Sequence, residues 1–381
     1  MESMELIVEP FAARIRAAAE SGTLLRIRGG GSKDFYGEPP QGELLETAPL
    51  AGISSYEPTE LVVTARAGTP LATLEAALAE RGQCLAFEPP HFGSPGVKGE
   101  DGAGTSAATV GGMVAAGLSG PARASVGSVR DYVLGLTMIN GRGEVLTFGG
   151  QVMKNVAGYD VSRLMAGALG TLGLITEVSL KVLPVAPAEA TLKFEMSHAE
   201  ALRRLNAWGG KPLPLNASCW LGEAGVQTLY LRLRGAVAAV EAACGTLGGE
   251  RQENALAAVH WTRCRDQRLP WFEERGGQRD LWRLSVPQTA PVLDLPELPL
   301  IEWHGGERWV RAEPGDARRL REAASRAGGH ATLFAPAADR TAPAASRFTP
   351  LPPALARIHR ELKRQFDPAG IFNRGRQYAD F

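Results

Sequence analysis

Glycine is the residue that most constrains how this chain can fold. The chain has 45 glycines among 381 residues, well above the usual share of about 7%. They gather between Gly22 and Gly173. Glycine adopts backbone conformations closed to other residues, and it lets another group approach the main chain closely. This half of the chain is therefore expected to hold something with its backbone more than with its side chains.

Three glycine clusters lie in this half: Gly29-Gly30-Gly31-Ser32 after the strand-like LLRIR, a run of small residues at 109–120, and GALGTLG at 167–173. Each also has a plain reading, as a tight turn, as a helix that packs through Gly and Ala, and as a loop. Neither a Walker A loop nor a Rossmann G-x-G-x-x-G fingerprint follows the first strand. Together the clusters predict one long dinucleotide laid across several loops, since such loops present N–H groups to phosphates.

Periodicity predicts the elements around these loops. One helix is expected to begin at Pro10 and end at Gly22, and a second to follow Thr69-Pro70, with three leucines on one side, and end at Gly82. Strands are expected at LVVTAR and in LGLITEVSLKVLP, where alternation indicates a half-buried strand. VLGLTMIN and EVLTFGG are expected to form a hairpin about residues 141–143.

Composition shifts at PVAPAEA, residues 184–190, which indicates a linker. A strand–helix–strand–strand–helix series follows, with a capping box of Ser197 and Glu200, and residues 250–280 show no clear pattern. Three strands, a helix and ATLF come next, then a linker and a final helix with Leu355, Ile358, Leu362 and Phe366 on one face. The expected domains are 1–185, a smaller α+β cap at 190–335, a linker at 336–352, and a C-terminal helix and tail at 353–381 that pack on the first domain.

Charge and cysteine usage exclude several classes of protein. Lys and Arg total 41, as do Asp and Glu, so the chain lacks the excess of positive charge typical of nucleic-acid binding. No apolar run approaches a membrane span, and the acidic start MESMELIVEP does not fit a signal peptide. The four cysteines form no C-x-x-C, which argues against a cysteine-held iron–sulfur or zinc cluster and fits a reduced, cytosolic compartment.

Five motifs, in this order and spacing, carry a resemblance to a known family. They are RGGGSKDFYG (28–37), TVGG (109–112), KNVAGYD (154–160), GTLGLITE (170–177) and FDPAGIFN (366–373). They resemble FAD-linked oxidases with the PCMH-type, vanillyl-alcohol oxidase-like domain. More narrowly, GLSGPAR, VRDYVLG and GGQVMKNVAGYDVSRLMAG resemble the FAD-binding E subunits of bacterial glycolate oxidases. The similarity is dense over 24–184, sparse in the middle, and returns at 353–376.

The resemblance implies an α+β fold: an FAD domain of two α/β lobes, a split β-α-β, ferredoxin-like cap, and a C-terminal helix returning to the FAD domain. Residues 29–33 are expected to cradle the pyrophosphate, 109–120 to line flavin and phosphates, and Asn373 to lie beside the isoalloxazine. Asp131 and the backbone at 170–175 are expected to hold ribose and adenine. The residues expected to bind FAD are Arg28, Gly29, Gly30, Gly31, Ser32, Lys33, Thr109, Gly111, Gly112, Gly117, Leu118, Ser119, Gly120, Asp131, Gly170, Gly173, Ile175 and Asn373.

The chain departs from the family pattern in two places. Ser32 stands where some relatives carry the histidine that tethers FAD, so the resemblance implies non-covalent FAD. Catalytic relatives carry a histidine pair that binds a metal, whereas no two of the six histidines here lie within five residues, so no metal is expected. His91 and His304 are the candidates for a catalytic base, and each also fits a structural role. Lys154 and Asn155 are expected to act as structural caps, and the stretch 93–106 as a lid or a disordered insertion.

The resemblance implies a subunit of a glycolate oxidase that converts glycolate to glyoxylate. The expected partners are a homologous D subunit with the full catalytic motif and an iron–sulfur subunit. Because the histidine pair is missing, the chain is expected to be an accessory or electron-carrying flavoprotein, cytoplasmic and held at the inner membrane face only through its complex. Two alternatives stay open: a stand-alone flavin-dependent 2-hydroxyacid or alcohol dehydrogenase, and a non-catalytic assembly subunit with a vestigial FAD site.

Overall fold

The computed structural model describes residues 4–93, 107–150, 160–223, 225–272, 278–337 and 345–381. The chain forms two compact units. The first unit comprises Met1–Leu118, Ser128–Pro184 and Pro350–Phe381, and the second comprises Ser119–Gly127 and Val185–Thr349. The chain therefore crosses between the two units four times.

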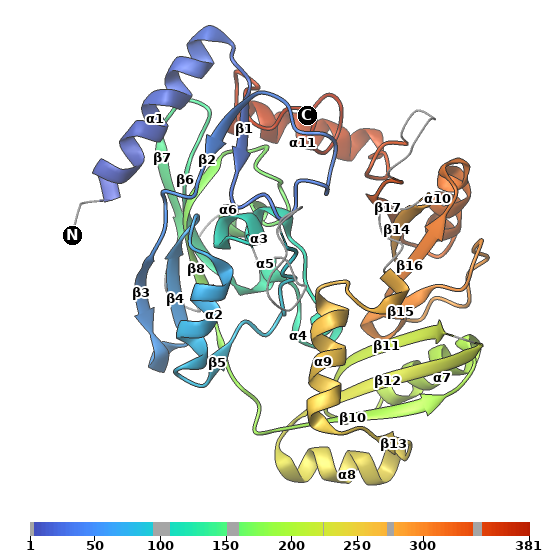
Figure 1. Ribbon diagram of the computed structural model, residues 1–381. Coiled ribbons are helices and arrows are strands. Elements are labelled where there is room, and N and C mark those ends of the chain that lie inside the picture. The colour runs from blue at the N-terminus through green and yellow to red at the C-terminus, as the bar shows by residue number, and fades with distance from the viewer. Residues whose placement is uncertain (1–3, 94–106, 151–159, 224, 273–277, 338–344) are drawn as a thin grey trace. The chain divides into compact units, whose positions relative to one another are not determined.

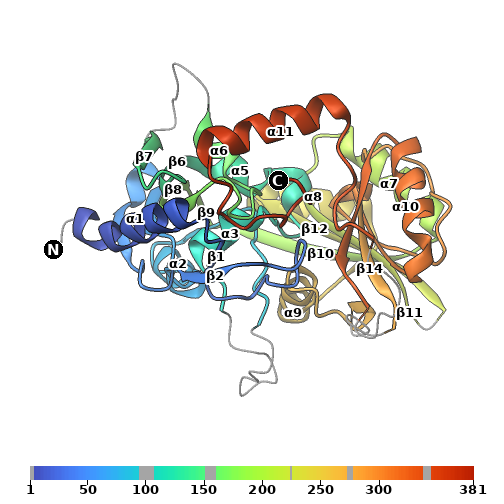
Figure 2. The ribbon, with the colours of Figure 1, turned by 90° about the horizontal axis from the view of Figure 1, so that it is seen from above.

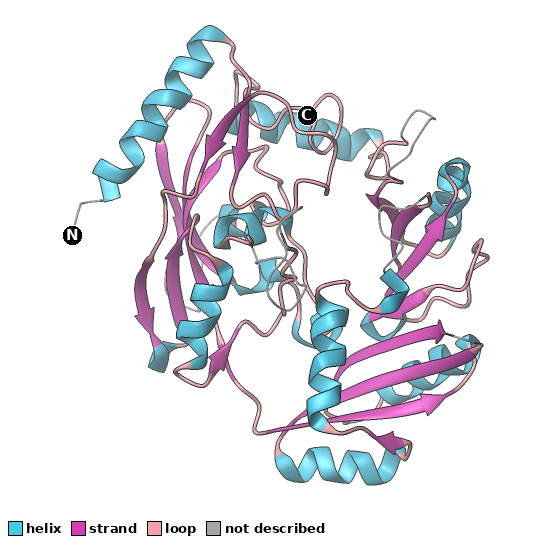
Figure 3. Cartoon of the chain, viewed as in Figure 1, coloured by secondary structure: helices cyan, strands magenta, loops and turns pink. Residues whose placement is uncertain are grey.

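The first unit is built on a five-stranded antiparallel sheet with the order β3-β4-β8-β6-β7 (Figures 1 and 3). Its strands are β3 (Ile53–Glu57), β4 (Val62–Arg66), β6 (Val133–Ile139), β7 (Val145–Gly149) and β8 (Leu174–Lys181). The β6–β7 pairing confirms the expected hairpin. The strand expected in LGLITEVSLKVLP is confirmed as β8. It is more buried than its alternation predicted, because β8 is the central strand and Ser179 is buried against Thr64, with 2.8 Å between the two hydroxyls.

A second layer of the first unit packs helix α1 (Met4–Ser21) over the parallel pair β1 (Leu25–Arg28) and β2 (Glu43–Glu46). The prediction that this helix begins at Pro10 is wrong, since Pro10 lies inside it. Val8 and Ile15, on either side of the proline, are buried in the same cluster, and this packing outweighs the backbone hydrogen bond that proline cannot donate.

Short elements complete the first unit. They are η1 (Pro58–Glu60), α2 (Leu71–Ala79), β5 (Gln83–Cys84), α3 (Val110–Ala116), α5 (Val129–Tyr132), α6 (Val161–Leu164), β9 (Leu183–Pro184) and α11 (Pro353–Phe366). Helix α2 buries the three predicted leucines and is confirmed. Helix α11 is present as predicted, but Leu355 and Ile358 on its expected apolar face are 46% and 50% exposed. Its buried anchor is instead a charged residue, Lys363.

The second unit is built on an eight-stranded antiparallel sheet with the order β13-β10-β12-β11-β15-β16-β14-β17 (Figure 3). Its strands are β10 (Ala188–Glu195), β11 (Leu215–Glu223), β12 (Val226–Gly235), β13 (Glu250–Arg251), β14 (Asp280–Ser285), β15 (Leu300–Glu302), β16 (Glu307–Ala312) and β17 (His330–Ala335). Its helices are α4 (Arg123–Val126), α7 (His198–Gly209), α8 (Val237–Leu247), α9 (Asn254–Arg265) and α10 (Ala317–Arg326), with 3₁₀ turns η2 (Pro270–Phe272), η3 (Trp303–Gly305) and η4 (Pro314–Asp316).

Helices α7, α8 and α10 cover one face of this sheet. Ile301 packs in the core cluster beneath α7 and α8. It is paired with Arg308 of β16, so the two side chains lie on the same face of the sheet. Val310, two residues further along β16, lies on that face too and packs beneath α10. Figure 2 shows α7 and α10 along the same side of the strands. Helix α9 lies on the opposite face, where Trp261 donates a hydrogen bond to Thr191.

The strand and helix series predicted for this unit is present, and the expected α+β class is confirmed. Ser197 caps α7 by accepting the amide of Glu200, as its capping-box pattern predicts. Helix α9 has no counterpart among the predicted elements, because it exposes Leu256 and Val259 and so has no clear apolar face. No helix within the described ranges combines the length and hydropathy needed to cross a bilayer.

Candidate functional site

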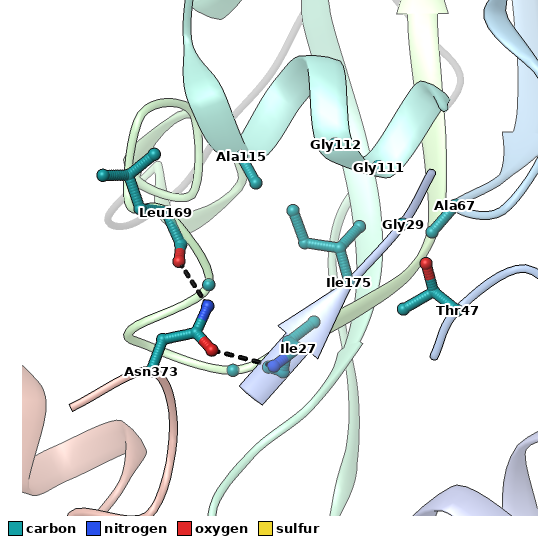
Figure 4. Close-up of a pocket in the computed structure, with 12 residues that line it drawn as sticks. Ile27, Gly29, Thr47, Ala67, Gly111, Gly112, Ala115, Leu169, Ile175 and Asn373 are labelled. Carbon is teal, nitrogen blue, oxygen red and sulfur yellow. Dashed lines mark hydrogen bonds between the residues drawn. The ribbon is translucent and has the colours of Figure 1, made fainter. Parts of the chain in front are cut away.

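Two adjoining cavities in the first unit form the candidate site. Their volumes are about 70 and 90 Å³. The residues that line both are Ile27, Gly29, Gly112, Ala115, Leu169 and Asn373 (Figure 4). The smaller cavity adds Thr47, Ala67, Gly111, Gly170, Gly173 and Ile175, and the larger adds Arg28, Gly30, Gly31, Ser32, Lys33, Asp34, Thr109, Ala116 and Arg376. All three glycine clusters that the sequence singled out therefore meet at one place.

The loop after β1 presents main-chain amides to the larger cavity. Within the described residues, the amides of Gly29 to Ser32 donate no backbone hydrogen bond. The loop lies directly on the segment before α3, since a Cβ on Gly30 would come 1.6 Å from the carbonyl oxygen of Ala107. Only glycine fits there, and a cluster of N–H groups with no backbone partner among the described residues suits an anion.

Helix α3 forms a second wall. Thr109 caps it by accepting the amide of Gly112 at 3.3 Å, and the amide of Gly111 donates to the carbonyl of Ala67 at 2.7 Å. A Cβ on Gly111 would come 2.6 Å from Cβ of Ala67. The small residues at 109–116 thus have two roles: they let the helix pack closely on its neighbours, and they leave room on the side that faces the cavity.

Asn373 joins three parts of the site (Figure 4). Its Oδ1 accepts the amide of Ile27 at 2.8 Å, and its Nδ2 donates to the carbonyl of Leu169 at 2.7 Å. The C-terminal tail, β1 and the 167–173 turn are therefore fixed to one another at the cavity lining. Asn373 is 5% exposed and adopts a left-handed φ of 38°, which asparagine tolerates better than most residues.

Other residues of the tail support the site, and no sequence pattern had pointed to them. Lys363 donates to the carbonyls of Thr171 at 2.6 Å and Phe372 at 2.8 Å, and pairs with Asp367 at 2.8 Å. Burial lowers the pKa of Lys363, while the neighbouring Asp367 carboxylate opposes that shift. Arg376 donates to the carbonyls of Lys33, Asp34 and Glu38, which holds the glycine loop from behind.

Charge at the larger cavity is positive on balance. Lys33 and Arg376 line it, and the Arg28 guanidinium there pairs with Asp34 at 2.7 Å. Lys33 also contacts the hydroxyl of Ser32 at 3.3 Å and lies 5.7 Å from the ring centre of Phe92. Main-chain amides, a positive side chain and close-packed glycines together fit a dianionic pyrophosphate. The residues present therefore fit a dinucleotide.

Some residues predicted to bind the cofactor lie elsewhere. Asp131 forms a capping box with Ser128 at the start of α5, and the hydrogen bonds from Ser128 lower the pKa of Asp131 against the opposing effect of burial. Gly117 ends α3, and Leu118 is buried beside it, but neither lines either of these two cavities. Ser119 and Gly120 belong to the second unit. Lys154, Asn155 and most of the 93–106 stretch lie outside the described residues.

Neither candidate histidine lines the two cavities. His91 lies 2.8 Å from the Glu75 carboxylate in the first unit. His304 lies in the second unit, where its Nε2 is 3.1 Å from the Ser125 hydroxyl and burial lowers its pKa to about 4. Within the described ranges, no three His, Cys, Asp or Glu side chains gather as metal ligands.

This chain is similar to known FAD-binding proteins in sequence and to several solved structures in fold. Residues 8–149 match the family model of an FAD binding domain, which covers the glycine loop and α3. Solved structures at low identity share the fold: p-cresol methylhydroxylase with substrate bound is 15% identical with a TM-score of 0.70, covering 98% of this chain and 87% of that chain. Xylooligosaccharide oxidase from Myceliophthora thermophila is 17% identical with a TM-score of 0.63, covering 98% and 90%.

Similarity in sequence is more specific. A D-lactate dehydrogenase of Archaeoglobus fulgidus is 31% identical over 178 residues, which are 46% of this chain and 37% of that protein. Glycolate oxidase subunit GlcE of Escherichia coli K12 is 46% identical over 367 residues, which are 96% of each chain. The likeness to GlcE spans both units. This chain therefore belongs to the family of GlcE-type glycolate oxidase subunits, among the FAD-linked oxidoreductases.

Proposed function

We propose that this chain is the FAD-binding subunit of a glycolate oxidase that converts glycolate to glyoxylate. The observation that supports the proposal most is the meeting of the amides at 29–32, helix α3 and Asn373 around one pair of cavities. Similarity to GlcE over 96% of both chains supports the complex and its substrate.

Each part of the chain has a role in holding the cofactor. The amides of residues 29–32 and the Lys33 ammonium bind the pyrophosphate, since both are donors to an anion. Gly111, Gly112 and Ala115 leave space along α3 for the rest of the nucleotide. Asn373 and Arg376 hold the lining loops in place. FAD, when bound, would supply the redox chemistry of the subunit, because a flavin can take up electrons and pass them on. FAD is bound non-covalently, because Ser32 occupies the position of a tethering histidine.

We propose an accessory or electron-carrying role rather than the main catalytic one. A general base must lie within hydrogen-bond reach of the substrate hydroxyl and have a pKa near the working pH. His304 has a pKa of about 4 and its Nε2 contacts Ser125, and His91 is engaged by Glu75. The chain works with a homologous D subunit and an iron–sulfur subunit. It is cytoplasmic, and it reaches the inner face of the inner membrane through these partners.

The test is the absorbance spectrum of the chain purified alone, before and after anaerobic glycolate. We expect flavin bands that persist with glycolate and bleach once the partner subunits are added. Bleaching by glycolate in the isolated chain would contradict the accessory role and favour a stand-alone dehydrogenase. Absence of flavin bands after incubation with FAD would contradict the proposed function and favour a vestigial site.

A further inference from the structure

One loop of the chain folds apart from its sequence neighbours. Residues 119–127, here called the crossing loop, belong to the second unit, whereas Leu118 and Ser128 on either side belong to the first. The loop contains α4 and continues directly from α3, which lines both cavities. Contacts that restrain the crossing loop therefore also restrain the segment that follows α3.

Residues 303–305 of the second unit, here called the clasp turn, hold the crossing loop at three points. The indole N–H of Trp303 donates to the carbonyl of Gly120 at 3.0 Å. The guanidinium carbon of Arg123 lies 4.4 Å from the Trp303 ring centre, a cation–π contact. The Nε2 of His304 lies 3.1 Å from the hydroxyl of Ser125. The contacts are spread along the loop, so they fix its path as well as its position.

The clasp turn has an uncommon backbone. Trp303 and His304 have φ of 52° and 55°, followed by Gly305 at 100°. Non-glycine residues are strained in this region of backbone conformation, and such strain persists only where the surroundings enforce it. One restraint is the His304 amide, which donates to the Ser218 hydroxyl of β11 at 2.9 Å. The conformation places Trp303 and His304 against the loop.

His304 is suited to holding a hydroxyl rather than transferring a proton. It is 9% exposed, and burial lowers its pKa to about 4, so the ring is neutral at physiological pH. Its Nδ1 has no hydrogen-bond partner among the described residues. Its side chain therefore forms its hydrogen bond through Nε2, with the hydroxyl of Ser125. A neutral imidazole can accept or donate one such bond without an accompanying charge.

A shift of the crossing loop would reach the cavities through the end of α3. The carbonyls of Val114 and Ala115 accept the amides of Gly167 at 3.0 Å and Leu169 at 2.8 Å. Leu169 lines both cavities, and its own carbonyl accepts from Asn373. The last turn of α3 is thus connected to two sides of the cofactor site.

We propose that the clasp turn is a positioning element for bound FAD: through the crossing loop it fixes the end of α3 at the cavity wall. The inference rests on the proposed function, because it takes FAD as the occupant of the cavities. Trp303 and His304 act here as positioning residues, in place of the catalytic role considered for His304.

The first test compares Trp303→Phe with Trp220→Phe. Each removes one indole hydrogen bond of 3.0 Å to a backbone carbonyl of the second unit, but the Trp220 bond goes to Met196 in place of the crossing loop. Hydrogen exchange of the apo chain is measured for peptides covering 119–127, and FAD affinity and the visible circular dichroism of bound FAD are measured separately. We expect Trp303→Phe to speed exchange and weaken FAD roughly fivefold, the effect of one hydrogen bond, and to alter the dichroism. Trp220→Phe should change none of the three.

The second test is a double-mutant cycle between Ser125→Ala and His304→Phe. If their contact fixes the loop, each single variant weakens FAD binding and the double variant weakens it no further. Unchanged exchange at 119–127 in Trp303→Phe, or faster exchange with unchanged FAD affinity, would overturn the inference. A wild-type chain that binds no FAD would overturn the proposed function instead, while the exchange comparison would still decide whether the clasp turn holds the loop.

Discussion

At the scale of single residues, the site depends on side chains that hold loops rather than on side chains that react. Asn373 bridges β1 and the turn before β8, and Lys363 neutralises Asp367 while capping two carbonyls. The bonds to Ile27, Leu169 and Thr171 join segments more than 190 residues apart in sequence. The geometry of the cavities therefore depends on a tail that contributes little surface to them.

Asn373→Asp tests the bridge. The variant keeps an acceptor for the Ile27 amide but replaces the donor to Leu169 with a carboxylate, which repels that carbonyl and a phosphate. We expect a loss of about 1–3 kcal/mol in the free energy of unfolding, the cost of an unpaired buried group. Urea denaturation followed by circular dichroism measures it, with the exposed Asn254→Asp as the control. Equal stability of the two variants would contradict the bridging role.

Lys363→Met tests the buried ion pair. Removing the ammonium leaves the Asp367 carboxylate buried and unpaired, so we expect a loss of about 3–5 kcal/mol in unfolding free energy. Adding Asp367→Asn should recover part of the loss, because an amide oxygen can still accept the Ile371 or Phe372 amide. Urea denaturation followed by far-ultraviolet circular dichroism measures both, and the exposed Lys211→Met serves as control. A loss below about 1 kcal/mol would show that the pair contributes little.

At the scale of elements, strands β15 and β16 carry a buried pair of acids. Glu302 and Glu307 face each other across the ladder, and each is 3% exposed. Glu302 accepts the Trp309 indole N–H at 2.9 Å. Burial and the Glu302 charge raise the pKa of Glu307 well above its usual range, although the guanidiniums of Arg283 and Arg123 oppose the shift.

Glu307→Gln tests the pair through pH. A carboxyl whose folded pKa is raised stabilises the protein below its unfolded pKa, and that contribution is lost as pH rises through the folded value. The melting temperature of Glu307→Gln relative to wild type should therefore increase from pH 5 to 8. All seven tryptophans lie within 185–349, so tryptophan emission follows this unit. The exposed Glu253→Gln is the control, and a pH-independent difference for Glu307→Gln would contradict the shift.

His260 in helix α9 should make stability depend on pH in the opposite direction. His260 packs 4.1 Å from the Tyr230 ring centre, and burial together with Arg232 lowers its pKa to about 4. Stability from such a group is present above the unfolded pKa of about 6.5 and lost as pH falls through 4. His260→Phe keeps an aromatic ring that cannot protonate, so its melting temperature should fall less than that of wild type between pH 6.5 and 4. Parallel curves for the two proteins would contradict this account, and pH 8 provides the reference.

Local patterns predicted these elements well where one strong signal dominated. The leucines of α2 and the capping box of α7 each specify a helix by themselves. The start of α1 and the burial of β8 depended on contacts with distant segments, which periodicity does not contain. The glycine loops were found from sequence because close approach demands glycine, whereas Lys363 and Arg376 act on carbonyls that no sequence pattern marks.

At the scale of the whole molecule, neither unit is one continuous segment. The first unit needs its C-terminal tail, and the second includes the crossing loop from the middle of the expected FAD domain. A chain cut after residue 184 lacks Asn373, Lys363 and the clasp turn together. We expect this fragment to bind FAD at least about a hundredfold more weakly than the full chain, or to aggregate, because the lining loops lose their partners. Full-chain affinity in the fragment, measured by calorimetry, would show that the tail is dispensable.

The most direct test of the central claim, that the glycine loop and α3 form the FAD site, is a titration with FAD. Wild type is compared with Gly30→Ala, whose Cβ would come 1.6 Å from the Ala107 carbonyl oxygen, and with Gly315→Ala, where nothing lies within 4 Å. We predict one FAD per chain for wild type and Gly315→Ala, released by acid precipitation as expected for a non-covalent cofactor. Gly30→Ala should bind at least about tenfold more weakly, or ~1.4 kcal/mol. Wild-type affinity in Gly30→Ala would contradict the placement of the cofactor.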